Sequence, residues 1–327
     1  MSYSTTTAHN VNYAQAQSTT STDLSSITSR TPLKGEISPI CTWDDLPTWM
    51  RDNPSILTGY RRQTFSYKKC LASLLFLHNE SVNIWSHLLG ALACVIIAPL
   101  IYTNVFQTLD TILWADIVVF YIFLFGAVIC LSISGFFHTF SCHSEPVCGH
   151  WNRCDYVGIV LLITGSYIPS TYYMFYCFKT WQILYSALIT VFGIATIISV
   201  IRPELRRPHY RWIRSVMFLA LGFSGIFSLI HAAFLYGFSL GQKAIALDYL
   251  LYMAASYVIG ALLYASRTPE KFFPGKFDHF GSSHQIFHIC VLMGVTFHII
   301  GTIKTMSFWH DANHSCSVSI EQMRILY

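Results

Sequence analysis

The chain has 327 residues, of which 53% are hydrophobic and 11% are charged, and its mean hydropathy is +0.47. This composition is too apolar for a soluble globular protein and predicts an integral membrane protein, for which no nucleic-acid partner is expected. The net charge of +4 says little, because in a membrane protein the positions of the positive residues matter more than their sum. The ten cysteines show no paired-cysteine framework, so we expect most of them to be small buried residues.

Two segments precede the first long apolar run. Residues 1–40 are rich in Ser and Thr and poor in large apolar residues, which predicts a disordered cytosolic tail. Residues 41–83 interleave aromatic residues with Lys and Arg, a pattern typical of a segment that lies along a membrane surface. Packing beneath a helix bundle is the alternative for this juxtamembrane segment.

Seven apolar runs are long enough to cross about 30 Å of hydrocarbon as helices. A backbone inside lipid must satisfy its own hydrogen bonds, so these runs predict an all-α integral membrane protein with a seven-transmembrane helix bundle over residues 84–306 and a short external tail over 307–327. The expected runs cover residues 84–103, 114–138, 156–177, 181–201, 212–236, 247–266 and 284–306.

The positive residues divide unevenly between the two sides of such a bundle. Thirteen lie on the side of the amino terminus and four on the other side, so the positive-inside rule places the amino terminus in the cytosol and the carboxyl terminus outside. This orientation is opposite to that of G-protein-coupled receptors, which disfavours a rhodopsin-type receptor.

His284 and His288 begin the last run and stand four residues apart, so on a helix both imidazoles lie on one face and can reach one metal ion. With the predicted orientation, His138 and Ser134 near the end of the second run and Asp155 just before the third lie at the same membrane depth. Three imidazoles and a water make the open tetrahedral site of a catalytic zinc, where Asp155 could hold the water or take its proton and Ser134 could hydrogen-bond the water or a substrate carbonyl. Separately satisfied interior polar residues are the alternative.

Two further groups of residues could bind a metal or ligand. The first is a cluster of Cys and His in the loop expected between the second and third runs, whose spacing matches no zinc knuckle. The second comprises histidines inside apolar runs, which are more often hydrogen-bonded packing residues. These residues are Cys142, His143, Cys148, His150 and Cys154 in the loop, and His87, His231 and His298 in the runs.

Three motifs occur in order along the chain: HNESVNIWSHLLG at residues 78–90, FHTFSCHS at 137–144, and PEKFFPGKFD at 269–278, leading into SHQIFH at 283–288. They resemble the progestin and adipoQ receptor family, which includes the adiponectin receptors, haemolysin III proteins and fungal zinc-homeostasis and osmotin-receptor proteins. The resemblance covers about residues 55–306. The low-complexity tail favours a fungal-type member.

The resemblance implies a zinc ion held by His138, His284 and His288, a metal-associated water held by Asp155, and a place for Ser134 in the site. The wider superfamily also contains alkaline ceramidases, which cleave ceramide to a sphingoid base and a fatty acid. One hypothesis is therefore a zinc hydrolase of a ceramide-type lipid amide, linked to sphingolipid signalling and zinc homeostasis.

The alternative is a non-enzymatic signalling receptor with a structural zinc, whose ligand would be an external protein or a steroid. Whether the chain is an enzyme stays open at this stage, as does its compartment, plasma membrane or endoplasmic reticulum. A zinc transporter is disfavoured, because the ligand candidates gather at one face of the membrane instead of forming a polar path across it.

Overall fold

The computed structural model describes residues 38–311 and residue 316. Most of the expected tail, residues 1–40, and of the expected external segment, 307–327, lies outside the described residues, and that division of the chain stays a prediction. The described elements are β1 (Ile40–Cys41), β2 (Tyr60–Arg61), α1 (Tyr67–Ala72), α2 (Ser81–Asn104), α3 (Trp114–Phe140), α4 (Glu145–Met174), α5 (Lys179–Val200), α6 (Arg211–Phe223), α7 (Ile226–Tyr236), α8 (Phe238–Ala244), α9 (Leu247–Ser266) and α10 (Ser283–Trp309), with short 3-10 turns between them.

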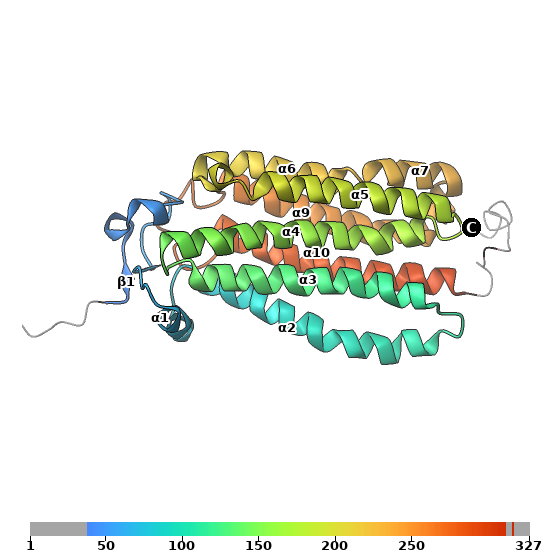
Figure 1. The fold of residues 1–327 in the computed structure, drawn as a ribbon, viewed down its shortest axis with the longest axis horizontal. Helices are drawn as coiled ribbons and strands as arrows, with labels where there is room; N and C mark the ends of the chain where they lie inside the picture. The colour runs from blue at the N-terminus through green and yellow to red at the C-terminus, as the bar shows by residue number, and fades with distance from the viewer. Residues whose placement is uncertain (1–37, 312–315, 317–327) are drawn as a thin grey trace, which may run out of the picture. The chain divides into compact units, whose positions relative to one another are not determined.

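The expected seven-helix membrane bundle is confirmed. Seven helical stretches are long and apolar enough to cross a membrane, and they run side by side along one axis, with α1 and β1 at one end (Figure 1). The spans are Ser81–Thr108, Trp114–Phe140, Glu145–Met174, Lys179–Val200, Pro208–Tyr236, Leu247–Ser266 and Ser283–Trp309.

The central helices of the bundle are α3, α4 and α10. About half of each of their apolar windows is buried, 50%, 56% and 50% respectively, whereas the other spans are 17% to 28% buried. The exposed side chains of the outer helices are mainly Leu, Ile, Val and Phe, which suits contact with lipid tails. Since α3, α4 and α10 also carry the predicted metal-site residues, the site lies on the best-enclosed part of the fold.

Small residues let α3 and α4 approach each other closely. A Cβ on Gly158 of α4 would lie 3.1 Å from the Cα of Cys130, and one on Gly126 of α3 would lie 3.0 Å from the Leu161 carbonyl oxygen. Glycine at these positions allows the backbones to pack as membrane helices commonly do. This contact fixes the positions of Ser134 and Asp155, which lie farther along the same two helices.

Most helix ends lie within a few residues of the expected ones, but two crossings depart from the expectation more strongly. The third crossing begins at Glu145 instead of residue 156, because Glu145 and Pro146 favour a helix start in a polar stretch that hydropathy does not register. The fifth crossing consists of α6 and α7, separated at Ser224 and Gly225. There the Tyr167 hydroxyl donates to the Gly222 carbonyl and its ring occupies the space a Cβ on Gly225 would need, so an inserted side chain interrupts the helical ladder.

The juxtamembrane segment packs on the loop between α9 and α10. The Asp278 carboxylate accepts the N–H groups of Leu57 and Thr58, at 3.0 and 2.8 Å. Glu270, which is fully buried, accepts from the Asn53 side chain at 3.0 Å. The stretch around Asn53–Thr58 therefore packs against the end of the bundle. In contrast, α1 and the turn after it expose Leu71 and Leu75 beside Lys68 and Lys69, as a segment at a membrane surface would.

The opposite end of the bundle carries a disulfide. Cys177, in the turn after α4, is bonded to Cys316. Near it, the His310 Nε2 atom lies 3.2 Å from the buried carboxylate of Asp116. The expectation that most cysteines are small buried residues holds for six of the eight free cysteines in the described part of the chain, but Cys177 and Cys316 instead form a covalent link between two segments.

Candidate metal centre

The first turn of α10 is set by a buried carboxylate. Ser282, the residue before the helix, makes no side-chain capping hydrogen bond. Instead, Glu270 accepts from the Ser283 N–H at 2.8 Å and from the Ser283 hydroxyl, which satisfies a donor that every helix start leaves free. The loop before α10 therefore fixes where the helix begins, and His284 and His288 follow on one face.

The end of α3 is held by Arg61. Its guanidinium is buried, with 3% of the residue exposed, and it donates to the carbonyl oxygens of His138 and Thr139 at 2.5 and 2.9 Å. Carbonyls in the last turn of a helix lack partners within the helix, and a cation there also suits the helix dipole. His138 therefore lies on a helix end that the juxtamembrane segment stabilises.

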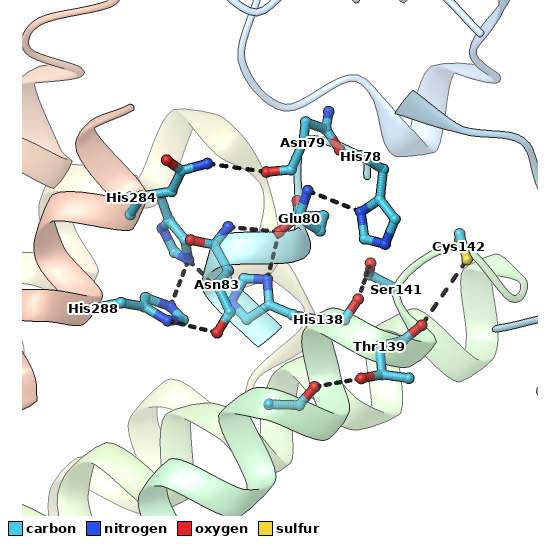
Figure 2. A network of polar contacts seen from close by, with 12 residues as sticks. His78, Asn79, Glu80, Asn83, His138, Thr139, Ser141, Cys142, His284 and His288 are labelled. Atoms are coloured by element: carbon cyan, nitrogen blue, oxygen red, sulfur yellow. Dashed lines mark hydrogen bonds and ion pairs between the residues drawn. The ribbon is translucent and has the colours of Figure 1, made fainter. Parts of the chain in front are cut away.

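The three predicted histidine ligands meet. The Nε2 atoms of His284 and His138 are 3.1 Å apart, and those of His288 and His284 are 3.2 Å apart. The ligand atoms of all three lie within 4.8 Å of one another and could hold a metal ion (Figure 2). Two nitrogens at about 2.0–2.1 Å from a tetrahedral ion are about 3.3 Å apart, so these two separations from His284 suit an ion of that kind.

Two polar groups from the first residues of α2 and the turn before it orient the rings. The Nδ1 atom of His138 is 2.8 Å from the Glu80 carboxylate, and the Nδ1 atom of His288 donates to the Asn83 carbonyl at 3.1 Å (Figure 2). These contacts leave the Nε2 atoms facing the centre of the cluster. Sequence reasoning did not predict either role, although both residues lie in the HNESVNIWSHLLG motif.

Ser134 and Asp155 lie beside the cluster. Ser134 is 3% exposed on α3, one turn before His138, and Asp155 is 9% exposed near the start of α4. The Ser134 hydroxyl lies close to the Asp155 carboxylate. All five predicted site residues therefore lie at one end of the bundle, on its three central helices.

Several known proteins resemble this chain over most of its length. A sequence model described as haemolysin-III related matches residues 75–299. The chain belongs to the haemolysin III-related family. It is 36% identical over 282 residues to the adiponectin receptor protein of Drosophila melanogaster and 39% identical over 279 residues to the progestin and adipoQ receptor-like protein 1 of Caenorhabditis elegans, covering 86% and 85% of this chain.

The match to these two animal relatives covers only 63% of the length of each. The match to a fungal relative, the ADIPOR-like receptor IZH1 of Eremothecium gossypii, is 35% identical over 290 residues and covers 88% of this chain and 90% of that protein.

A cavity of about 340 Å³ opens beside the histidine cluster of this family member. Asp155, His284 and Arg214 line it near the end of the bundle that holds the histidines, and Met174 at the end of α4 lines it toward the other end. Asp155 and Met174 are separated along α4 by about 28 Å at 1.5 Å per residue. Its lining is mostly apolar, so the cavity is long and suited to a hydrocarbon chain.

The rival metal-ligand groups do not assemble. Among residues 38–311, the one cluster of three or more histidine, cysteine or acidic side chains with metal-binding spacing is His138, His284 and His288. The expected Cys and His loop is largely helix: it includes the start of α4, and Cys142 instead contacts Cys70, with 3.6 Å between the sulfur atoms.

The remaining interior histidines behave differently from one another. The His87 ring stacks on the His288 ring, with 3.6 Å between centroids. His298 packs edge-on against Phe123, and His231 lies against the Trp181 ring. Of the three, His87 therefore contacts the histidine cluster, and the other two are packing residues.

Proposed function

We propose that this protein is a zinc-dependent hydrolase of a ceramide-type lipid amide, releasing a sphingoid base and a fatty acid. The observation that carries this proposal is the meeting of three imidazoles and Asp155 at one end of a long apolar cavity. A membrane lipid can lay its acyl chain along such a cavity while its amide group stands beside the imidazoles. We further propose that the activity serves sphingolipid signalling and zinc homeostasis, at the plasma membrane or the endoplasmic reticulum.

Zinc is the ion that this ligand set fits best. Three imidazoles would leave a fourth tetrahedral position for water or substrate, as in catalytic zinc sites, whereas a structural site would usually contain a fourth protein ligand. When bound there, zinc lowers the pKa of a coordinated water toward about 7 and polarises the substrate carbonyl.

Asp155 is the proposed general base and general acid. Its carboxylate lines the cavity beside His284, so it can accept a proton from the attacking water and later give that proton to the amine nitrogen as the C–N bond breaks. Water supplies the hydroxyl group of the released fatty acid, and the amine leaves with the transferred proton. The Ser134 hydroxyl, which lies close to the same carboxylate, would help to position Asp155.

Arg214 gives the cavity a positive charge near the reacting groups. The residue is 4% exposed and donates to the Leu205 and Arg207 carbonyls and, at 3.3 Å, to the Tyr264 hydroxyl. No carboxylate in the described part of the chain lies within ion-pair distance of it. A buried cation without an acidic partner favours an electron-rich ligand group, such as a carbonyl or carboxylate oxygen.

A receptor function is the second candidate, because the curated relatives from fly, worm and fungus carry receptor names. In that case zinc would tie α3 to α10, and an external protein or steroid would shift the bundle. The released sphingoid base could itself be the signal, so the two functions are compatible.

The deciding experiment measures fatty acid release from a panel of ceramides by the purified full chain in detergent. We expect release by the zinc-loaded protein, its loss after treatment with a chelator, and its return when zinc is added back. Protein that carries about one zinc per chain and releases nothing from any ceramide would refute the hydrolase and leave zinc in a structural role.

We also propose that the metal centre faces the cytosol. The uneven distribution of Lys and Arg supports this orientation, and so does the Cys177–Cys316 disulfide at the opposite end, because disulfides persist in oxidising compartments.

An epitope tag at the amino terminus should therefore be detected by antibody only after cells are permeabilised, whereas a tag at the carboxyl terminus should be detected on the non-cytosolic side. Detection of the amino-terminal tag outside would overturn the orientation.

A further inference from the structure

We propose that the turn formed by residues 78–83 is a positioning element for the metal centre, with Glu80 fixing His138 and Asn83 fixing His288. The inference rests on the proposed zinc site, and it assigns a role to a motif that none of the catalytic steps above uses. Residues 78–80 precede α2, and residues 81–83 are its first three residues. The two imidazoles belong to other helices, α3 and α10.

Glu80 makes the first contact. One of its carboxylate oxygens lies 2.8 Å from the His138 Nδ1 atom and accepts from the Asn83 side-chain nitrogen at 2.6 Å. A carboxylate on one ring nitrogen of a ligating histidine fixes the tautomer, orients the ring and raises the basicity of the other nitrogen. In His138 that other nitrogen is the Nε2 atom, which faces His284 at 3.1 Å.

Asn83 makes the second contact with its backbone. Its carbonyl accepts from the His288 Nδ1 atom at 3.1 Å, so His288 also presents its Nε2 atom to the cluster. Because the Asn83 side chain donates to Glu80, the two contacts are linked. A movement of the first turn of α2 would therefore disturb two of the three imidazoles together.

The turn is itself held firmly. The His78 Nδ1 atom accepts from the Glu80 N–H at 3.1 Å, and the Asn79 carbonyl accepts from Gln285 on α10 at 3.2 Å. Burial, helped by the nearby Arg61 charge, lowers the pKa of His78 to about 3, so its Nδ1 atom is free to accept this hydrogen bond at neutral pH. The position of Glu80 is thus fixed from both sides.

Glu80 is suited to act through His138 and not as a ligand itself. In the described residues, the group with metal-binding spacing contains the three histidines and leaves Glu80 out. The ion pair that the structure gives Glu80 is with His138, and no Lys or Arg of the described chain lies within ion-pair distance of it. A carboxylate near the membrane boundary whose nearest partner is an imidazole is best stabilised when that imidazole binds a divalent cation.

Zinc affinity tests the proposal without any measure of hydrolysis. The purified full chain and its variants compete for zinc with a chromogenic chelator, and melting temperatures are recorded with and without zinc. Glu80→Gln keeps an oxygen for both hydrogen bonds but removes the charge, so we expect zinc affinity to fall about tenfold. Glu80→Ala removes the contact altogether, and a fall of about 100-fold is expected.

Asp278→Asn is the matched control, because Asp278 is another carboxylate at this end of the bundle and its hydrogen bonds go to the juxtamembrane segment. We expect this variant to melt earlier by the same amount with and without zinc and to keep wild-type zinc affinity. The Glu80 variants should instead lose mainly the stabilisation that zinc adds.

Zinc affinities of both Glu80 variants within twofold of wild type would overturn the positioning role. Wild-type protein that binds no zinc would overturn the metal site on which this role rests, so the two failures are distinguishable. If Glu80→Ala does not fold, Glu80→Gln alone decides the question, because its amide oxygen can preserve the local hydrogen bonds.

Discussion

The double variant His284→Ala/His288→Ala should fold, bind no zinc and release no fatty acid from ceramide. The two imidazoles supply two of the three ligand atoms, and the remaining His138 alone cannot chelate an ion. The zinc content of the purified variant, measured by metal analysis, should therefore fall from about one zinc per chain to background. The rate of hydrolysis should fall with it. Gel filtration and a thermal melt of the zinc-free forms establish that the variant is folded.

His298→Ala provides the control for this loss. His298 is also a buried histidine of α10, but it packs on Phe123 far from the cluster. This variant should keep its zinc and its rate per folded molecule. Zinc retained by the double variant at the wild-type level would show that the ion binds elsewhere and would refute the proposed site.

The variant Asp155→Asn should keep its zinc and lose most of its hydrolytic activity. Asparagine has nearly the same shape but cannot take a proton from water, and removing a general acid–base group typically costs 10²- to 10⁴-fold in rate. We expect kcat to fall about 10²- to 10⁴-fold, while the zinc content of the protein stays at the wild-type level. Because the hydrolytic rate should fall while the zinc content is unchanged, this variant distinguishes a hydrolase from a receptor with a structural zinc.

Asp116→Asn is the matched substitution at the other end of the bundle. Asp116 is fully buried and accepts from the Tyr173 hydroxyl at 2.9 Å, so its loss should lower stability without changing the rate per folded molecule. A rate for Asp155→Asn within a few-fold of wild type would remove Asp155 from the proposed chemistry.

The spans were predictable because lipid imposes a length and a composition on every crossing. The His284 and His288 pair was predictable for a similar reason: the helix period places residues four apart on one face. His138 could be added because the direction of each crossing sets the depth of its residues. These are properties of single segments, which a sequence displays directly.

Contacts between segments were not predictable in the same way. Glu80 and Asn83 meet His138 and His288 across 58 and 205 residues of sequence, so their roles depend on how α2 packs beside α3 and α10. The Cys177–Cys316 bond joins residues 139 apart and has no spacing signature. The start of α4 at Glu145 was missed because its polar first turns extend beyond the apolar window that hydropathy detects.

The continuity of α10 has a mechanical consequence. The helix carries His284 in its first turn and ends at Trp309, followed at once by His310, which pairs with Asp116. His284 and His310 are thus the two ends of one rod about 39 Å long at 1.5 Å per residue. Metal–ligand distances tolerate deviations of only about 0.2 Å, whereas helices at switching interfaces shift by about 1–2 Å. An axial displacement of that size at the His310 end would move His284 away from its position beside His138. Helix α10 would therefore couple a change at one membrane face to the geometry of the histidine cluster at the other.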